Sequence, residues 1–350
     1  MKAIIGTQYG APEVLQLKEV EKPTPKDNEI LVKVHATTVN VGDSRMRSFN
    51  VPPLFWLPAR LTLGFTKPKN PIFGMELAGE VEGMGKDVKR FKVGDQVFAS
   101  TLEENFGAHA EYKCLSEDAA VAIKPPQVSY EDAATLPISA NTALYFLKKG
   151  NIQPGQKVLV NGASGGVGSF AVQLAKHFGA EVTGVCSSSN VTLVKSLGAD
   201  HVIDYTQVDF TKNGERYDII FDAAGKTAFP QCKNSLKDKG VFLSTVLLLS
   251  EIKGLWYAMT TGKQVVGGTA PVRPDALDYL SELVQQGQLK PVIDRLHPLE
   301  EIVAAHRYVD QGHKRGSVVI TVAHNHQGAQ RRLSKAVLEG RTEVNVLLQV

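Results

Sequence analysis

The chain is poor in cysteine and in net charge. Its three cysteines, Cys114, Cys186 and Cys232, lie far apart in a sequence of 350 residues, which argues against a disulfide framework and fits a reducing compartment. Lys and Arg total 39 and Asp and Glu total 36, so the formal net charge is only +3. Basic and acidic residues are mixed for most of the length, which predicts a solvated surface and no nucleic-acid-binding stripe.

Long hydrophobic runs are also absent. The longest apolar stretch, residues 241–249, is interrupted by Ser244 and Thr245 and falls well below the ~20 residues that a membrane span requires. The N-terminal segment holds too few apolar side chains for the core of a secretory signal. We therefore expect no transmembrane helix and a cytoplasmic location.

The length and the residue pattern predict two domains. With ~150 residues as the usual domain size, the chain is too long for one core. Apolar and polar side chains alternate over residues 30–36, and glycines that we expect in turns follow at Gly79, Gly83, Gly85 and Gly94, so the first part is interpreted as β.

From residue 130 onward, the pattern changes to alternating helices and strands. Helices are expected at 131–148, from the glycine cluster described below to 178, at 275–285 and at 299–309. Six strands are expected at 158–160, 182–185, 201–203, 218–222, 241–245 and 264–266, and a further strand at 317–322. This alternation predicts an α/β fold with a doubly wound parallel six-stranded sheet and helices on both faces.

The last part of the chain has no clear strand or helix pattern. Residues 323–350 carry two histidines and several basic side chains. We interpret them as an unstructured or artificially appended tail, in preference to a functional basic or metal-binding tail.

The most informative stretch is residues 157–168, KVLVNGASGGVG, in which a short apolar strand leads into a glycine cluster that begins a helix. Ala163, Gly165 and Gly168 take the three small-residue positions of a G-x-G-x-x-G pattern, so the backbone can approach a pyrophosphate closely. The unpaired N–H groups and the positive dipole end of the helix favour an anion there. A structural turn without a ligand is the alternative, which the flanking strand and amphipathic helix make less favourable.

Two further stretches complete a family pattern. Residues 74–97 read GMELAGEVEGMGKDVKRFKVGDQV, and residues 39–47 read VNVGDSRMR. With the glycine cluster, they resemble the medium-chain dehydrogenase/reductase superfamily, and within it the zinc-independent branch that is similar to quinone oxidoreductases. The resemblance covers nearly all of residues 1–322. It implies a GroES-like β-barrel domain at 1–124, completed by 271–322, and a Rossmann dinucleotide-binding domain at 125–270.

The resemblance also bears on zinc, which proteins hold with thiolate, imidazole and carboxylate ligands. The family's first ligand position falls at Gly42 and its histidine position at Met75, and neither side chain can bind the ion. The structural-zinc lobe would need four close cysteines around residues 100–114, where only Cys114 is present. We expect an enzyme without zinc, in which Glu76 is a structural carboxylate satisfied by backbone or Arg partners.

The end of the second expected strand bears on the choice of cofactor. An NAD-binding site usually places an acid about 20 residues beyond the glycine turn, but the residues after this strand read CSSSN. By resemblance, Ser187, Asn190 and Tyr205 hold the 2′-phosphate of NADP. Relatives usually add an Arg or Lys in this loop, where this chain has Ser189 and Asn190. We expect NADPH with modest discrimination against NADH; a solvent loop that caps a helix is the alternative.

Further contacts with NADP(H) are implied by the resemblance. Asn40 and Thr142 would lie near the nicotinamide and its ribose, and Lys314 near the cofactor phosphates. For Lys314 the alternative is a solvated surface lysine. For Thr142 the alternative is a hydroxyl that bonds to the backbone of its own helix. The remaining implied contacts are Ala163, Ser164, Gly165, Gly166 and Val167 at the pyrophosphate, and Ala224 and Val246 after later strands.

Without a metal to polarise a simple carbonyl, the resemblance favours acceptors whose negative charge spreads onto a conjugated oxygen. These are quinones and α,β-unsaturated carbonyls such as 2-alkenals and enones. Asn40 is our first catalytic candidate, as a donor to an enolate oxygen. Asp43 is the second and, like Ser44, could position the ribose or relay a proton. Each also has a structural interpretation, because Asn, Asp and Ser often form turns after a strand.

Residues 51–72 form an apolar insertion with several prolines. Phe55 and Trp56 are candidates for a lipophilic substrate pocket. Core packing is an alternative, and so is peripheral contact with a membrane, because Trp prefers interfaces and basic residues are nearby.

Three functions therefore remain open. The first is an NADPH-dependent quinone or enone reductase with a small electrophilic substrate. The second is an enoyl-thioester reductase, which would use the same hydride chemistry with a longer acyl channel. The third is an NADPH-binding accessory protein with little turnover and an RNA or protein partner, and the low net charge weighs against RNA. Homodimers formed by edge-strand pairing are common among relatives and are considered for this chain too.

Overall fold

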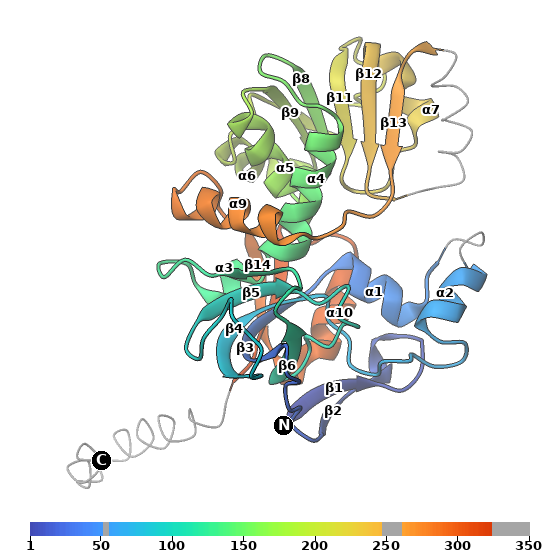
Figure 1. Cartoon of the computed structure of the whole chain (residues 1–350). Coiled ribbons are helices and arrows are strands. Elements are labelled where there is room, and N and C mark those ends of the chain that lie inside the picture. Colours follow the sequence, from blue (N-terminus) through green and yellow to red (C-terminus); the bar gives the residue numbers. More distant parts are fainter. Residues whose placement is uncertain (52–55, 247–260, 324–350) are drawn as a thin grey trace, which may run out of the picture.

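The computed structural model describes residues 1–51, 56–246 and 261–323. The chain forms two bodies that lie one above the other in Figure 1. The upper body is built on a six-stranded sheet with the order β10-β9-β8-β11-β12-β13, in which all neighbouring strands are parallel. Its strands are β8 (Lys157–Asn161), β9 (Glu181–Cys186), β10 (His201–Asp204), β11 (Tyr217–Asp222), β12 (Leu236–Ser244) and β13 (Gln264–Gly267). The expected doubly wound parallel sheet is confirmed.

Both faces of this sheet are buried, which is why its strands read as nearly continuous apolar runs. Along β8, Val158 and Val160 pack with helices on one face, whereas Leu159 belongs to a separate apolar cluster on the other face. The first face is covered mainly by α4 (Asn141–Lys149), α5 (Gly166–His177) and α6 (Val191–Ser196), and α9 (Pro274–Gln285) packs against α4. On the second face lies α7 (Phe229–Cys232), which is followed by η5 (Lys233–Ser235). The short helices η4 (Ser188–Asn190) and α6 (Val191–Ser196) follow β9.

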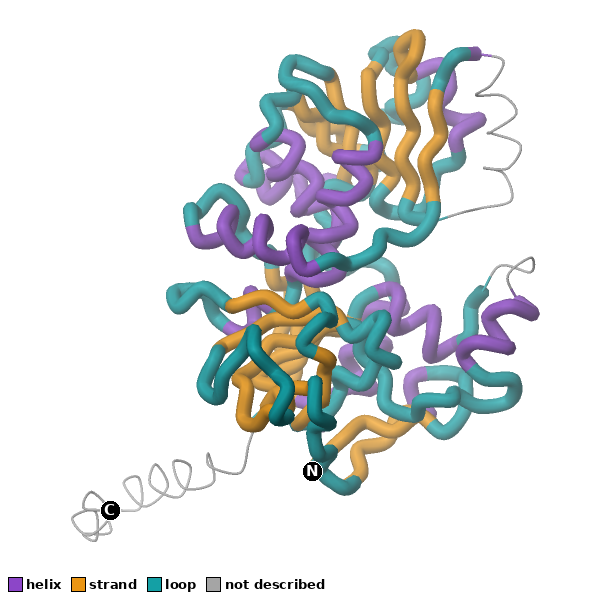
Figure 2. The backbone as a smooth tube through the Cα atoms, viewed as in Figure 1, coloured by secondary structure: helices purple, strands orange, loops and turns teal. Residues whose placement is uncertain are grey.

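The lower body is mainly β structure, as Figure 2 shows. A seven-stranded sheet has the order β14-β15-β3-β4-β5-β7, with β6 paired to β3, and only β14 and β15 are parallel. Its strands are β3 (Glu29–Val39), β4 (Glu76–Met84), β5 (Gln96–Ser100), β6 (Tyr112–Ser116), β7 (Val121–Ile123), β14 (Ile293–Pro298) and β15 (Ser317–Thr321). A separate antiparallel pair is formed by β1 (Lys2–Gly6) and β2 (Leu15–Glu19), joined by η1 (Pro12–Val14).

Several sequence predictions need correction. Gly79 and Gly83 lie inside β4 and not in turns. A side chain on Gly79 would collide with the Lys33 carbonyl of β3, so this glycine allows close strand approach. The helix expected at 131–148 is broken into α3 (Tyr130–Ala133), a π-helical turn η3 (Leu136–Ala140) and α4, with Pro137 in the break.

Elements that the sequence pattern did not predict lie in the lower body. They are α1 (Val41–Ser48), α2 (Trp56–Leu63) and β14. The helix expected at 299–309 is present as η6 (Leu299–Glu301) followed by α10 (Ile302–Asp310). No helix in the described ranges is long and apolar enough to cross a bilayer. Residues 324–350 lie outside the described ranges, and the domain boundaries at 124/125 and 270/271 stay predictions.

Polar contacts join the two bodies. The Gly316 N–H, just before β15, donates to the Ser164 carbonyl in the glycine turn at 2.7 Å. The Ile138 N–H in η3 donates to the Glu76 carboxylate in β4 at 2.7 Å. These contacts bring the start of β15 and the start of β4 against the carboxyl edge of the parallel sheet, where a dinucleotide would bind.

Candidate functional site

The glycine turn connects β8 to α5. Gly162 has a φ of +80°, so this residue makes the tight turn that sequence analysis had not assigned to it. A side chain on Gly168 would collide with the Gly162 carbonyl, so only glycine allows α5 to pack this closely on the turn. Ala163 is fully buried, and its N–H donates to the Val185 carbonyl of β9 at 3.0 Å. The turn is therefore held rigidly by its neighbours.

The amino end of α5 has no side-chain cap. Its N-cap residue is Gly165, whose lack of a side chain leaves the first N–H groups of the helix without such a partner. Gly166 and Val167 form the first helical positions, where N–H groups lack partners within the helix. The backbone therefore offers donors and a positive dipole end to an anion.

Lys314 and Ser139 reach this helix end from other parts of the chain. A Cβ built on Gly166 would lie 2.9 Å from Lys314 Nζ and 3.1 Å from Ser139 Oγ. The ammonium of Lys314 also donates to the Gly316 carbonyl at 2.6 Å. Burial lowers the pKa of Lys314 to about 8, while the Glu76 charge acts in the opposite direction. Lys314 is thus an interdomain cation and not a freely solvated one, and sequence analysis missed Ser139.

The loop after β9 brings together three residues expected to contact cofactor. The Asn190 amide nitrogen donates to Ser164 Oγ and to Ser187 Oγ, each at 3.1 Å, so it joins the glycine turn to this loop. Its Oδ1 atom is buried without a hydrogen-bond partner in the described ranges. Tyr205 follows β10 and is exposed, and its N–H donates to the Cys186 carbonyl at 3.0 Å.

An acid near this loop was missed because it lies at the end of the third strand along the chain. Asp204 of β10 accepts hydrogen bonds from Ser188 Oγ, and from the N–H and the hydroxyl of Thr206 at 2.9 and 2.7 Å. The Ser188 and Thr206 hydrogen bonds lower the pKa of Asp204. The loop therefore combines neutral donors with a carboxylate.

On the other side of the turn, two more expected contacts lie after β11 and β12. A Cβ built on Gly162 would lie 2.8 Å from Ala224 Cβ, so Ala224 adjoins the glycine turn. Val246 lies against Gly225, which has a φ of +64°. Thr142 is half-buried in the first turn of α4, and its hydroxyl makes no hydrogen bond to the described part of the chain.

Asn40 and Asp43 form a capping box at the start of α1. The Asp43 N–H donates to Asn40 Oδ1 and the Asn40 N–H donates to Asp43 Oδ2, each at 3.0 Å. Burial raises the pKa of Asp43 to about 8. Among the described residues, Asn40 Nδ2 and Asp43 Oδ1 have no hydrogen-bond partner although both are buried. Both residues thus have a clear helix-capping role. The Asn40 side chain also lies close enough to Glu76 to act on the pKa of that carboxyl, so the Asn40 amide faces a buried acid.

Glu76 is a buried carboxylate beside these residues. It accepts hydrogen bonds from the Thr38 hydroxyl and from the Ile138 N–H. Burial raises its pKa to about 7. Of the partners expected for it, the backbone donor is present, but the second partner is a threonine hydroxyl and not an arginine.

Gly42 and Met75, at which the resemblance places the family's zinc ligands, are neighbours. A Cβ built on Gly42 would lie 2.9 Å from the Met75 sulfur. Neither position offers a thiolate, imidazole or carboxylate. Across residues 1–51, 56–246 and 261–323, no group of three or more His, Cys, Asp or Glu residues could hold a metal ion.

Arg45 of α1 was not singled out from the sequence, although it lies within the VNVGDSRMR stretch. A Cβ built on Gly225 would lie 3.9 Å from Arg45 Nη2, so the guanidinium reaches across to the loop after β11. Arg45 is exposed overall. Its guanidinium therefore lies at the loop that follows the carboxyl end of β11.

Comparison with known proteins agrees with this arrangement. The family described as "Alcohol dehydrogenase GroES-like domain" matches residues 26–125, and the one described as "Zinc-binding dehydrogenase" matches residues 197–320. The chain is 34% identical to "Quinone-oxidoreductase homolog, chloroplastic" of Spinacia oleracea, over 91% of this chain and 98% of that protein.

The chain belongs to the medium-chain dehydrogenase/reductase superfamily.

Another member of the superfamily, "NADPH-dependent alkenal/one oxidoreductase, chloroplastic" of Arabidopsis thaliana, is 30% identical over 91% of this chain and 79% of its own length. The solved quinone oxidoreductase of Coxiella burnetii superposes with a TM-score of 0.83 at 31% identity and covers 92% of this chain and 99% of that one. This chain is therefore an oxidoreductase of the quinone-oxidoreductase-like group, with a GroES-like domain and a Rossmann sheet.

The expected substrate-pocket residues of this superfamily member lie in the 51–72 insertion. Phe55 lies outside the described residues. Trp56 begins α2, a helix without a buried residue, so core packing does not describe it. Its ring contacts Phe49 and Phe65 edge-on, with centroids 6.4 and 6.0 Å away. In Figure 1, α2 lies beyond α1 at the outer edge of the lower body.

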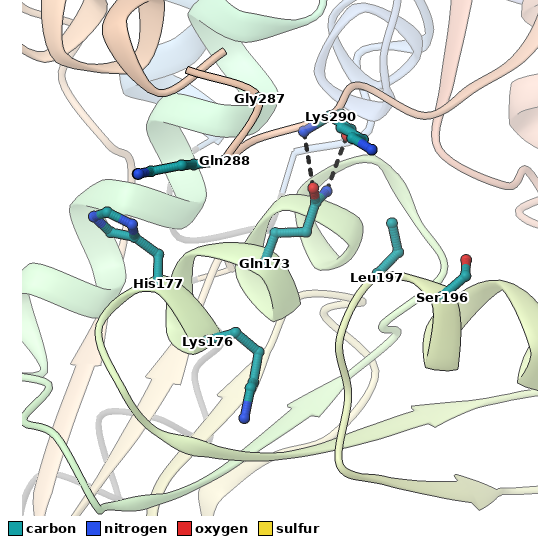
Figure 3. Close-up of a pocket in the computed structure, with 8 residues that line it drawn as sticks. All are labelled: Gln173, Lys176, His177, Ser196, Leu197, Gly287, Gln288 and Lys290. Atoms are coloured by element: carbon teal, nitrogen blue, oxygen red, sulfur yellow. Dashed lines mark hydrogen bonds between the residues drawn. The ribbon is translucent and has the colours of Figure 1, made fainter. Parts of the chain in front are cut away.

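A cavity of about 370 Å³ lies at the opposite end of α5 from the glycine turn, and Figure 3 shows its lining. The Gln173 side chain spans it to the backbone of Lys290, donating to the carbonyl at 2.9 Å and accepting from the N–H at 2.8 Å. Lys176, also in the lining, is paired with Asp200 at 2.8 Å. A dinucleotide bound at the glycine turn would not enter this cavity.

Proposed function

We propose that this chain is an NADPH-dependent reductase that delivers hydride to quinones or α,β-unsaturated carbonyls without zinc. The observation that carries the proposal is the uncapped amino end of α5 with the Lys314 ammonium against Gly166. A cation beside the positive end of a helix is unfavourable by itself, and the phosphates of a dinucleotide would neutralise both. When bound, the dinucleotide supplies the hydride.

The strand order supports an orientation for this cofactor. The connection reverses between β8 and β11, so the adenosine half would lie over β9 and β10 and the nicotinamide half over β11 and β12. Ser187, Asn190 and Tyr205 would then contact the adenosine ribose and its phosphate. Ala224 and Val246 would lie beside the nicotinamide half.

Arg45 and Asn40 lie toward the same half and would serve the substrate. Charge that develops on a substrate oxygen needs a cation or donors, and Gly42 and Met75 provide no ligands for zinc. We therefore assign the oxygen to the Arg45 guanidinium, and the amide nitrogen of Asn40 is the second candidate donor. Conjugated acceptors suit such donors, because their negative charge is delocalised.

A substrate panel tests the proposal. NADPH oxidation is measured with benzoquinones, naphthoquinones, 2-alkenals and enoyl-CoA, in the presence and absence of a strong chelator. We expect turnover with quinones or alkenals that the chelator does not change. Turnover with enoyl-CoA alone would identify an enoyl-thioester reductase, whereas NADPH binding with no turnover would identify an accessory protein; either result contradicts the proposal.

Replacing Arg45 tests its role. Arg45→Met removes the charge but keeps a long side chain, so we expect kcat to fall by about 10²-fold while the Kd for NADPH changes little. Arg216→Met, at an exposed arginine in the loop before β11, is the control and should match the wild type. An unchanged kcat for Arg45→Met would remove this residue from the mechanism.

Replacing Asn40 needs a variant that keeps its helix-capping role. Asn40→Ser retains an acceptor for the Asp43 N–H but lacks the amide donor, so we expect about a tenfold lower kcat with a smaller change in NADPH affinity. A thermal melt checks that the cap survives. If NADPH affinity fell more than turnover, Asn40 would be a cofactor contact and not a catalytic donor.

The remaining predictions concern the setting of the enzyme. β10 and β13 are the edge strands of the parallel sheet, and a homodimer formed through such an edge stays a prediction. The cytoplasmic location also stays a prediction, since two of the relatives above bear chloroplastic names.

A further inference from the structure

Four of the exposed large apolar side chains in the described ranges lie on and beside α2. We call Trp56, Leu57, Leu61 and Phe65 the α2 face; their residues are 42%, 54%, 63% and 59% exposed. α2 buries none of its residues. Scattered apolar side chains on a surface need no explanation, but a group of large ones on one short element indicates an interaction surface.

Polar and ring contacts hold α2 and the loop after it against the rest of the protein. The Arg60 guanidinium stacks on the Phe49 ring at 3.7 Å and donates to the Phe65 carbonyl at 2.6 Å. Tyr9 donates its hydroxyl to the Leu63 carbonyl at 2.9 Å, and Lys69 donates to the Leu61 carbonyl at 2.6 Å. The apolar side chains are thus presented by a helix and the loop after it, and the Leu61, Leu63 and Phe65 carbonyls have hydrogen-bond partners.

The charge around the α2 face is of one sign. Between Asp43 and Glu76 the sequence contains no Asp or Glu. Of the basic residues in this stretch, Lys67 and Lys69 are exposed beside the α2 face, and Arg60 stacks on the Phe49 ring behind it. Arg45 and Arg47 do not belong to this surface, because Arg45 reaches toward Gly225 and Arg47 is buried and paired with Asp310. In a chain whose basic and acidic residues nearly balance, this local excess is complementary to an anionic partner.

We propose that the α2 face binds an anionic lipid bilayer, with α2 lying in the interfacial plane. Leu and Phe side chains would enter the acyl boundary, Trp56 would lie at the headgroup level, and Lys67 and Lys69 would face the lipid phosphates. A second copy of the chain is a poorer occupant, because two such faces would bring like charges together. The proposal concerns a surface outside the proposed dinucleotide site and does not depend on the reductase activity.

Co-sedimentation with vesicles tests this surface. The full chain is mixed with vesicles of phosphatidylcholine alone or with added phosphatidylserine, at low and high salt. We expect binding only when phosphatidylserine is present, weakened by salt, with a blue shift of tryptophan fluorescence.

The variant Leu57→Asp/Leu61→Asp should reduce binding to the phosphatidylserine vesicles by about tenfold or more. The matched control is Val93→Asp/Leu296→Asp, which adds the same charge at two other exposed apolar sites, 58% and 56% exposed, and should bind nearly as the wild type does. A thermal melt verifies that both variants fold. Equal loss in both variants, binding to phosphatidylcholine alone, or concentration-dependent self-association through the α2 face in place of vesicle binding would each overturn the proposal.

Discussion

The two ends of the proposed dinucleotide site differ in how they would treat a phosphate. At the amino end of α5, an uncapped helix, the Lys314 ammonium and the Ser139 hydroxyl converge on Gly166. At the loop after β9, Ser187 and Asn190 provide only neutral donors, and the Asp204 carboxylate lies close by, bonded to Ser188. The first end would attract any pyrophosphate. At the second end, the hydrogen bonds of Ser187, Asn190 and Asp204 within the described ranges involve only neutral partners, so no lysine or arginine is placed there to select a 2′-phosphate.

From this difference we expect affinity and selectivity to come from separate parts of the proposed dinucleotide site. The pyrophosphate is common to NADH and NADPH, so contacts at α5 would stabilise both cofactors equally. The choice between them depends on the weaker end, where hydroxyl and amide donors act against a nearby negative charge. Changes at the two ends should therefore have different signatures.

The largest effect is expected when a bulky side chain is placed in the glycine turn before α5. Gly168→Val would force a side chain into the Gly162 carbonyl, so we expect binding of both cofactors to be lost and the melting temperature to fall by several degrees. Calorimetric titration and a thermal melt measure these effects. Gly165→Ala is the control for stability, because its Cβ would make only an ordinary contact of 3.4 Å. An unchanged melting temperature for Gly168→Val would contradict the tight packing of this turn.

Removing the cation at α5 comes next. Lys314→Met should weaken NADH and NADPH by the same factor, about tenfold to a hundredfold, because a charge-assisted contact of about 1.5–3 kcal/mol is lost. Arg315→Met, at the exposed neighbour, is the matched control and should have little effect. If only the affinity for NADPH decreased, Lys314 would be assigned to the 2′-phosphate, which would contradict the proposed difference between the two ends of the site.

The same lysine predicts a pH dependence. Its pKa of about 8 means that the free protein carries the ammonium below that pH and loses it as the pH rises. Affinity for both cofactors should therefore decrease from pH 7 to pH 9 in the wild type. Lys314→Arg stays charged over this range and should give a flatter profile. An identical slope in the two proteins would assign the pH dependence to another group.

The smallest effect is expected at the loop after β9. Asp204→Asn removes the negative charge, so the preference for NADPH over NADH should rise about threefold to tenfold, as measured by the ratio of kcat/KM values. Asp209→Asn is a closely matched control, since Asp209 bonds Thr211 as Asp204 bonds Thr206. A ratio that changes equally in both variants would show a general charge effect and no specific role for Asp204.

The parallel sheet was predictable because its strands are buried on both faces. Val158, Ile219 and Leu243 lie in apolar runs bounded by turns, and such runs can be identified without knowing their neighbours. β14 was missed because half of its sequence, IDRLHP, is polar and its residues are at best partly buried at a sheet edge. α1 was missed because it starts with a capping box whose partners are buried by tertiary packing.

The candidate site likewise has residues that the sequence identified and residues that it did not. The glycine cluster and the loop after β9 were found because each is a local stretch that follows its own strand. Ser139, Arg45 and Asp204 were not found, because their positions depend on which elements the fold brings together. Gly79 was misinterpreted for a related reason, since the sequence does not distinguish a glycine in a turn from a glycine that lets a strand approach its paired neighbour closely.

The amino-acid sequence by itself determined the class of fold, the glycine turn before α5 and the loss of side chains able to hold zinc at Gly42 and Met75. These features depend on local runs or on the chemistry of single side chains. Only the tertiary structure decided that Lys314 meets Gly166, that Glu76 bonds Ile138, and that Arg45 faces Gly225. Such contacts join residues far apart in the chain, and they form only when the packing of two bodies compensates the entropy lost in ordering them.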